Sequence, residues 1–384
     1  MDIRHILMII LFVIAPIIII YLESKYSVVK KIGAVLICYG IGMIIGNVGV
    51  LPESAIKYQN LLATITVPLA LPLILFSMDI KRWFRLAGSA IASLIIGIFS
   101  VIALLLVGYW IYKGSIPDIW KVTGLLTGIY TGGTPNMAAI KTALNVDNGL
   151  YIMTHTYEVA MGAVYLLFIL SIGQRVFLLF LPPFQKAENS DQDENDLNIE
   201  DEFESYKGFF ERKTFLPLLG AFGLSVFILG ISFLLGKLLP EEYSTAATIL
   251  FITTFGILSS LIPKVKSIKK TFQLGMYIIL IFCIAVSSMA DLKQLANISF
   301  SLFYYVGLAM FGSHLLHALI AKFFKIDADT VIISGIALIC SPPFVPVVAG
   351  ALKNKEIILT GLTVGIVGYA VGNYLGIFIA YALK

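Results

Sequence analysis

Stretches of apolar residues long enough to cross a lipid bilayer recur along this chain and limit what it can fold into. A transmembrane helix needs about 20 predominantly apolar residues. Ten uninterrupted stretches approach that length: 6–22, 29–50, 60–78, 84–112, 149–174, 214–239, 244–262, 271–290, 296–324 and 356–383. Hydrophobic residues make up 59% of the sequence and charged residues 13%, against roughly 25% charged in a soluble protein. A water-soluble fold could not bury so much apolar surface, so the sequence predicts an all-α polytopic membrane protein.

The charged residues are unevenly distributed. The formal net charge is +4, from 27 basic and 23 acidic residues. Gln185–Lys207 alone holds nine acids and two lysines, which leaves 25 basic and 14 acidic residues in the rest of the chain. A basic surplus of this kind suits loops beside an anionic lipid leaflet. We therefore expect the lipid bilayer, and no nucleic acid, as the partner of this chain.

Two further apolar segments, 119–146 and 328–353, contain runs of residues that interrupt a helix. The first run consists of Thr131, Gly132, Gly133, Thr134, Pro135 and Asn136. The second consists of Ser341, Pro342, Pro343, Phe344, Val345 and Pro346. Proline removes a backbone donor, and glycine raises the entropic cost of a helix. Each segment is therefore predicted to hold two short helical arms joined by a broken tip.

The two breaks lie 210 residues apart, and a second pair of similar sequences supports an internal repeat. Phe76-Ser77-Met78-Asp79 ends one apolar stretch, and Ser288-Met289-Ala290-Asp291 ends another, with the aspartates 212 residues apart. The repeats are assigned to residues 1–184 and 209–384, joined by an acidic linker at 185–208. Each repeat has five crossings and one broken segment. Because five is odd, the repeats are expected to be inverted, as in transporters whose site lies at such breaks.

Lysine and arginine counts predict the orientation. If both broken segments are re-entrant hairpins, 19 basic residues fall on one side of the membrane and 8 on the other. If both segments cross fully, the split is 16 against 11. The positive-inside rule favours the hairpins, with both termini outside and the acidic linker in the cytoplasm.

The broken tips are the strongest candidates for a binding site. Non-helical backbone persists at membrane depth only where it is buried in protein or lines a wet cavity. Thr131–Asn136 offers backbone amides, two hydroxyls and a side-chain amide, and helix ends at the tip add partial charges. The more apolar Ser341–Pro346 is expected to contribute shape and carbonyl groups. The alternative is a helix kink whose glycines and prolines are satisfied by neighbouring helices.

Glu158 is the one acidic residue outside the linker that lies deep within an apolar stretch. A carboxylate at that depth is costly and usually functional. His155 precedes it by three residues and shares its helix face. The two side chains could bind Na⁺, relay a proton or contact a substrate amine. A structural hydrogen-bonded pair is the alternative.

Weaker candidates lie in other stretches. Thr64 and Thr66 precede Pro68 and Pro72, which would free carbonyls for an ion, although a kinked packing helix explains the pattern equally well. Asn373 lies among regularly spaced glycines in the last stretch, where small residues favour close helix packing. The cysteines show no metal-ligand spacing, so no metal other than Na⁺ and no cofactor is expected. No Walker-type loop, His-Glu-x-x-His or Gly-x-Ser-x-Gly motif is present, so we do not expect an enzyme.

These motifs resemble those of a bacterial membrane family, domain-of-unknown-function family 819, over nearly the whole chain. The resemblance is carried by Gly132-Gly133-Thr134-Pro135-Asn136-Met137, Phe76-Ser77-Met78-Asp79 and Cys340-Ser341-Pro342-Pro343. That family is distantly similar to sodium:glutamate symporters, 2-hydroxycarboxylate transporters and the bile-acid/cation-antiporter fold. The resemblance implies inverted repeats, a scaffold domain, a mobile core domain with both broken elements, a homodimer and a bacterial inner membrane.

The expected function is secondary active transport of a small polar or anionic organic solute, coupled to Na⁺ or H⁺. An elevator-like motion of the domain with the hairpins would give alternating access to the two sides of the membrane. The alternative is an uncoupled channel or a holin-like regulatory membrane protein.

Overall fold

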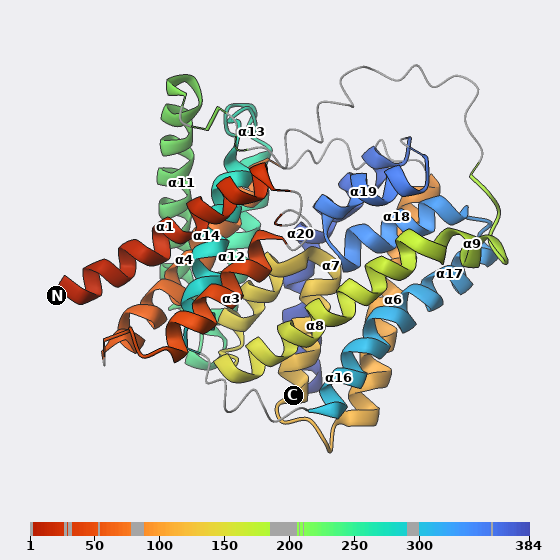
Figure 1. Ribbon diagram of the computed structural model, residues 1–384, viewed down its shortest axis with the longest axis horizontal. Coiled ribbons are helices and arrows are strands. Elements are labelled where there is room, and N and C mark those ends of the chain that lie inside the picture. The colour runs from red at the N-terminus through yellow and green to blue at the C-terminus, as the bar shows by residue number, and fades with distance from the viewer. Residues whose placement is uncertain are drawn as a thin grey trace. The chain divides into compact units, whose positions relative to one another are not determined.

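The computed structural model describes residues 3–26, 29, 33–52, 54–77, 88–184, 206, 208–209, 211–289, 299–354 and 356–384. All regular elements within these ranges are helical (Figure 1). The α-helices are α1 (Ile3–Lys25), α3 (Ala34–Asn47), α4 (Ala55–Phe76), α6 (Gly88–Tyr112), α7 (Ile119–Ala143), α8 (Asn148–Phe168), α9 (Gln174–Leu178), α11 (Arg212–Gly236), α12 (Glu241–Ser260), α13 (Pro263–Lys266), α14 (Thr271–Ser287), α16 (Phe300–Gly307), α17 (Ser313–Phe323), α18 (Ala328–Ile339), α19 (Val345–Ala351) and α20 (Ile358–Leu383). Two π-helical turns, Ile169–Gly173 and Leu308–Gly312, join α8 to α9 and α16 to α17.

Eight helices of the described residues are long and apolar enough to cross a membrane. They are Arg4–Lys25, Ala55–Phe76, Gly88–Tyr112, Asn148–Leu178, Arg212–Gly236, Glu241–Ser260, Phe300–Phe323 and Ile358–Leu383. The predicted all-α polytopic membrane class is therefore confirmed. The other two of the ten predicted stretches form shorter helices, α3 with 14 residues and α14 with 17. The latter lies at the lower limit of about 17 residues for a spanning helix.

The chain folds into two compact units, and each unit draws on both halves of the sequence. Unit 1 comprises residues 1–77, 141–155 and 205–298, and unit 2 comprises residues 78–140, 156–204 and 299–384. The predicted repeats at 1–184 and 209–384 therefore do not coincide with the compact units. The repeat relationship itself remains a prediction.

Unit 1 is built around the packing of α4 against α14, with α3 on α14 and both α11 and α12 on α4. Small residues allow close approach, because a Cβ at Gly256 of α12 would lie 3.2 Å from the Pro72 Cα of α4. Hydrogen bonds also join these helices: the Ser225 hydroxyl donates to the Leu69 carbonyl at 2.6 Å. Pro68 and Pro72 lie inside α4 without ending it. The tertiary packing of α4 thus overrides the helix-breaking tendency of both prolines.

A pair of variants on α3 tests the close packing in unit 1. A Cβ at Gly46 would collide with the backbone of Ser288, whereas a Cβ at Gly40 of the same helix meets nothing within 4 Å. We expect Gly46→Val to lower the free energy of unfolding by about 1–3 kcal/mol, because overpacking against backbone cannot be relieved by a rotamer change. Gly40→Val should change the free energy of unfolding by only a few tenths of a kcal/mol, because the two residues differ in helix propensity. Thermal unfolding of both purified variants checks this, and equal shifts in Tm would contradict it.

Unit 2 contains both broken segments and several polar ties between helices. In it α6 packs on α17 and α18, and α18 packs on α20. The Tyr305 hydroxyl donates to the Leu105 carbonyl at 2.9 Å and lies 2.8 Å from the Thr123 hydroxyl. Ser93 and the Nε2 atom of His317 are 2.9 Å apart. Because these groups satisfy one another, they fix the helices around the broken segments.

Candidate functional site

The first broken segment is interrupted at Gly132 and Gly133, within α7. Gly132 has φ −153° and ψ 17°, and Gly133 has φ 68° and ψ −167°, a combination that is essentially restricted to glycine. The chain doubles back at this point, since a Cβ at Gly128 would lie 3.4 Å from the Asn136 carbonyl and would collide with Ile140. A continuous helix would hold residues 128 and 140 roughly 18 Å apart. The segment is therefore a hairpin of two helical arms.

The second broken segment also doubles back. α18 ends at Ile339, Ser341 adopts a positive φ of 82°, and the chain continues through a 3₁₀ turn at Pro342–Phe344 into α19. Side chains tie its two ends together: the Asp329 carboxylate at the start of α18 accepts a hydrogen bond of 2.9 Å from Asn354, which follows α19. It accepts a second bond of 2.8 Å from Gln174. The buried Asp329 carboxylate, with its two amide donors, therefore holds the two ends of this hairpin together.

The two breaks meet within unit 2. A Cβ at Gly133 would overlap the Ser341 hydroxyl, so the two tips are in direct contact. Gly133 and Ser341 are 208 residues apart in the sequence. α20 passes both of them through its glycines. A Cβ at Gly368 would collide with the Thr131 carbonyl, and one at Gly365 would collide with Pro342. The glycine spacing of α20 thus serves close packing against both tips.

The polar side chains of the first tip are largely committed to the protein. The Asn136 side-chain amide donates to the Gly368 and Tyr369 carbonyls of α20 at 3.2 and 3.3 Å. The Thr131 hydroxyl donates to the Thr127 carbonyl at 2.7 Å. Because Pro135 has no N–H, the carbonyl of Thr131 loses its helical donor, and it is this carbonyl that faces Gly368. The hydrogen bonds of Asn136 therefore hold the tip on α20, whereas that of Thr131 stays within α7.

The outer part of each tip is only partly covered. Thr134 and Ser341 have intermediate exposure, whereas Pro135 and Pro342 are buried and Phe344 is 37% exposed. For Pro343 the structure describes the backbone alone, which lies in the 3₁₀ turn. Hydroxyl and backbone groups are thus the polar groups that the tips can offer to a ligand.

Glu158 of α8 belongs to the same unit as the two breaks. Its side chain is 8% exposed, and its carboxylate interacts electrostatically with the Tyr130 phenol and the Cys340 thiol. Tyr130 and Cys340 each directly precede one of the broken tips. Neither Tyr130 nor Cys340 was among the predicted site residues, and their positions next to the breaks were the only signal available. Unit 2 therefore brings together a buried carboxylate and both interrupted segments.

The remaining predicted residues are divided between the units. Asn373 is fully buried on α20 in unit 2. His155, Thr64 and Thr66 belong to unit 1. The His155 ring packs 4.6 Å from the ring of Tyr39, centroid to centroid. The hydroxyls of Thr64 and Thr66 donate to the carbonyls four residues earlier. Such local bonds are common for threonine in helices, and the role of Thr64 and Thr66 in a site stays a prediction.

Some predictions fall outside the described residues. These are the acidic linker, apart from Tyr206 and Gly208, and the span ends at Asp79 and Asp291. Among the residues that the structure does describe, no group of three or more His, Cys, Asp or Glu side chains is arranged to hold a metal ion.

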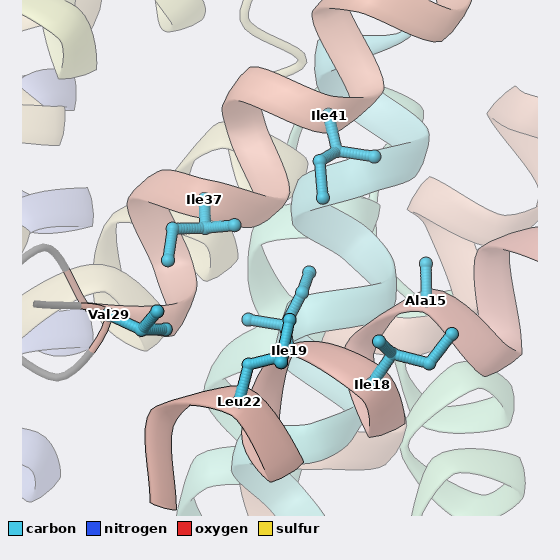
Figure 2. A pocket seen from close by; sticks show the side chains of 7 residues that line it. All are labelled: Ala15, Ile18, Ile19, Leu22, Val29, Ile37 and Ile41. Atoms are coloured by element: carbon cyan, nitrogen blue, oxygen red, sulfur yellow. The ribbon is translucent and has the colours of Figure 1, made fainter. Parts of the chain in front are cut away.

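An apolar groove in unit 1 differs from the site in unit 2. It lies between α1 and α3 and is lined by aliphatic side chains that include Ile19, Leu22, Ile37 and Ile41 (Figure 2). Among the residues that the structure describes, no polar side chain lines it. A polar solute would lose its hydration there without gaining hydrogen bonds, so the groove is not a candidate for polar recognition.

Similarity to known proteins agrees with the membrane architecture. The chain is 22% identical over 374 residues to the "Uncharacterized membrane protein YjcL" of Bacillus subtilis (strain 168), covering 93% of this chain and 91% of that protein. With eight helices long enough to span a bilayer among the described residues, this similarity supports a multi-pass membrane protein. A family profile matches residues 9–384, and the chain therefore belongs to the family described as Protein of unknown function (DUF819).

Proposed function

We propose that this protein is a secondary active transporter of a small polar or anionic organic solute, coupled to Na⁺ or H⁺. The observation that carries the proposal is the contact between the two breaks, Gly133 against Ser341, beside the buried carboxylate of Glu158. Two interrupted segments that meet in a membrane protein place irregular backbone where a bilayer supplies no hydrogen bonds. In transporters such breaks form the site for solute and coupling ion.

The local electrostatics suit a solute with a negative group. The second arm of α7 begins after the Gly132–Gly133 break and runs to Ala143, so its first N–H groups lie at the tip. Unsatisfied N–H groups and the positive end of the helix dipole favour an anion. The Thr134 hydroxyl and the Ser341 hydroxyl, both partly exposed, can add hydrogen bonds there.

The proposed orientation follows from the hairpins. Because the second segment begins and ends at the same place, tied by Asp329 and Asn354, it would enter and leave the bilayer on one side. The doubling back of α7 has the same consequence. This is the arrangement for which lysines and arginines divide 19 to 8. With the basic side in the cytoplasm, both termini would lie outside and the acidic linker would lie in the cytoplasm. We further propose that the protein is a homodimer in the bacterial inner membrane and moves by an elevator-like mechanism.

Reconstitution tests the function. The purified protein in proteoliposomes should accumulate radiolabelled solutes from a panel of amino acids, dicarboxylates and short peptides when a Na⁺ or H⁺ gradient is imposed. Collapse of the gradient with an ionophore should stop accumulation. Equal flux with and without a gradient would indicate an uncoupled channel. Absence of flux for every solute would contradict transport and favour a regulatory role.

A further inference from the structure

A buried hydroxyl next to the first break has no partner inside the protein. Tyr130 is fully buried, and its phenolic oxygen makes no hydrogen bond to any residue that the structure describes. A buried polar atom of this kind is rare, because it loses its hydration without compensation. Other buried tyrosines of unit 2 are satisfied, since Tyr305 bonds to Leu105 and Tyr165 bonds to His314. A solute that donates a hydrogen bond to the Tyr130 hydroxyl would supply the missing partner.

The surroundings of this hydroxyl are electronegative. The first arm of α7 ends beside Tyr130, and α18 ends beside Cys340, so two helix C-termini converge near the contact between the breaks. Helix C-termini carry partial negative charge from carbonyls without donors. The Glu158 carboxyl group is electrostatically coupled to both Tyr130 and Cys340 and offers further acceptor oxygens. A group with positive charge is favoured at this position.

We propose that Tyr130 and Glu158 bind the ammonium group of the transported solute, so that the substrate carries a primary amine together with an anionic group. This inference rests on the proposed transport function and names its substrate class. An ammonium group has three N–H donors, which match the carboxylate, the phenolic oxygen and a carbonyl at a helix C-terminus. The second arm of α7 begins at Thr134, four residues beyond Tyr130, and its N-terminus favours the anionic group. The ammonium group of the solute would lie at helix C-termini, and its anionic group would lie at the N-terminus of the second arm of α7.

The test compares solutes that differ only in the amine. Thermal unfolding of the full-length protein is followed in detergent with alanine and propionate, aspartate and succinate, and phenylalanine and 3-phenylpropionate. At least one amino acid should raise the Tm of the wild-type protein, and its partner without the amine should raise it less. Tyr130→Phe keeps the ring but removes the oxygen, so it should reduce the shift at least by half.

Tyr165→Phe is the matched control in the same unit. It removes a hydroxyl that bonds to His314, so it should lower the Tm without solute while leaving the solute-induced shift unchanged. Tyr130→Phe should have the opposite pattern, because loss of an unpaired buried hydroxyl does not destabilise the protein without solute. A structural role for Tyr130 would instead make both variants behave alike.

Four results would overturn the inference. The first is that no amino acid of the panel shifts the Tm, and the second is that each pair shifts it equally. The third is a rise in Tm caused by Na⁺ alone that disappears in Tyr130→Phe, since Tyr130 and Glu158 would then bind the coupling ion. Gradient-driven uptake of a solute without an amine would overturn the inference and leave the transport function intact.

Discussion

Gly133→Val is expected to abolish gradient-driven solute uptake. Gly133 has φ +68° and ψ −167°, which costs a residue with a side chain about 1–3 kcal/mol of strain. A branched side chain would also collide with the Ser341 hydroxyl. Strain and collision act at the point where the two breaks meet, so they would separate the tips rather than loosen a surface loop. Uptake in proteoliposomes should fall at least about 100-fold, as expected when binding groups are displaced by about 1 Å.

The control and a rescue experiment distinguish this from general damage. Gly220→Val on α11 introduces the same side chain where nothing lies within 4 Å, and uptake should remain at the wild-type rate. Gly133→Ala should be impaired less than Gly133→Val. Ser341→Gly removes the hydroxyl that the new Cβ would meet, and glycine also suits the φ of +82° at that position. The double variant Gly133→Ala/Ser341→Gly should regain activity, whereas purely additive effects would show that the breaks do not touch.

Much of the helical architecture could be predicted from the sequence, because apolar length and helix-breaking residues act locally. α6 and α20 occupy 88–112 and 358–383, against predicted stretches of 84–112 and 356–383. The interruption of α7 falls at the two glycines of the Thr131–Asn136 run. Proline predicted helix breaks less reliably than its missing N–H group suggests, since Pro68 lies within the continuous helix α4.

The roles of individual side chains at the breaks could not be predicted, because they depend on contacts with segments far away in the sequence. Asn136 was expected to face the solute, yet its amide donates to α20, more than 230 residues later. The same long-range packing leaves the Tyr130 hydroxyl buried without a hydrogen-bond partner among the described residues, whereas that of Tyr165 bonds to His314. The division into two units, each from both halves of the chain, has the same origin.

Glu158→Gln should reduce transport strongly while leaving the protein folded. The carboxylate is 8% exposed and belongs to the unit that holds both breaks, so a positive charge that binds there gains a strong interaction in a site of low dielectric constant. Glutamine keeps the shape and removes the charge. Loss of one partner from a buried ion pair typically costs about 3–5 kcal/mol, which corresponds to a reduction in affinity of roughly 100-fold or more.

The stability of the same variant tests the alternative role of Glu158. If the carboxylate serves binding, replacing it with a neutral amide removes a desolvated charge, so the Tm without solute should stay constant or rise. If it is instead part of a structural pair, the Tm should fall in Glu158→Gln and transport should decline only in proportion to the folded protein. Measurement of Tm and of initial uptake rates, at equal amounts of folded protein, separates these outcomes. Wild-type uptake with unchanged dependence on Na⁺ and pH would show that Glu158 has no part in the transport cycle.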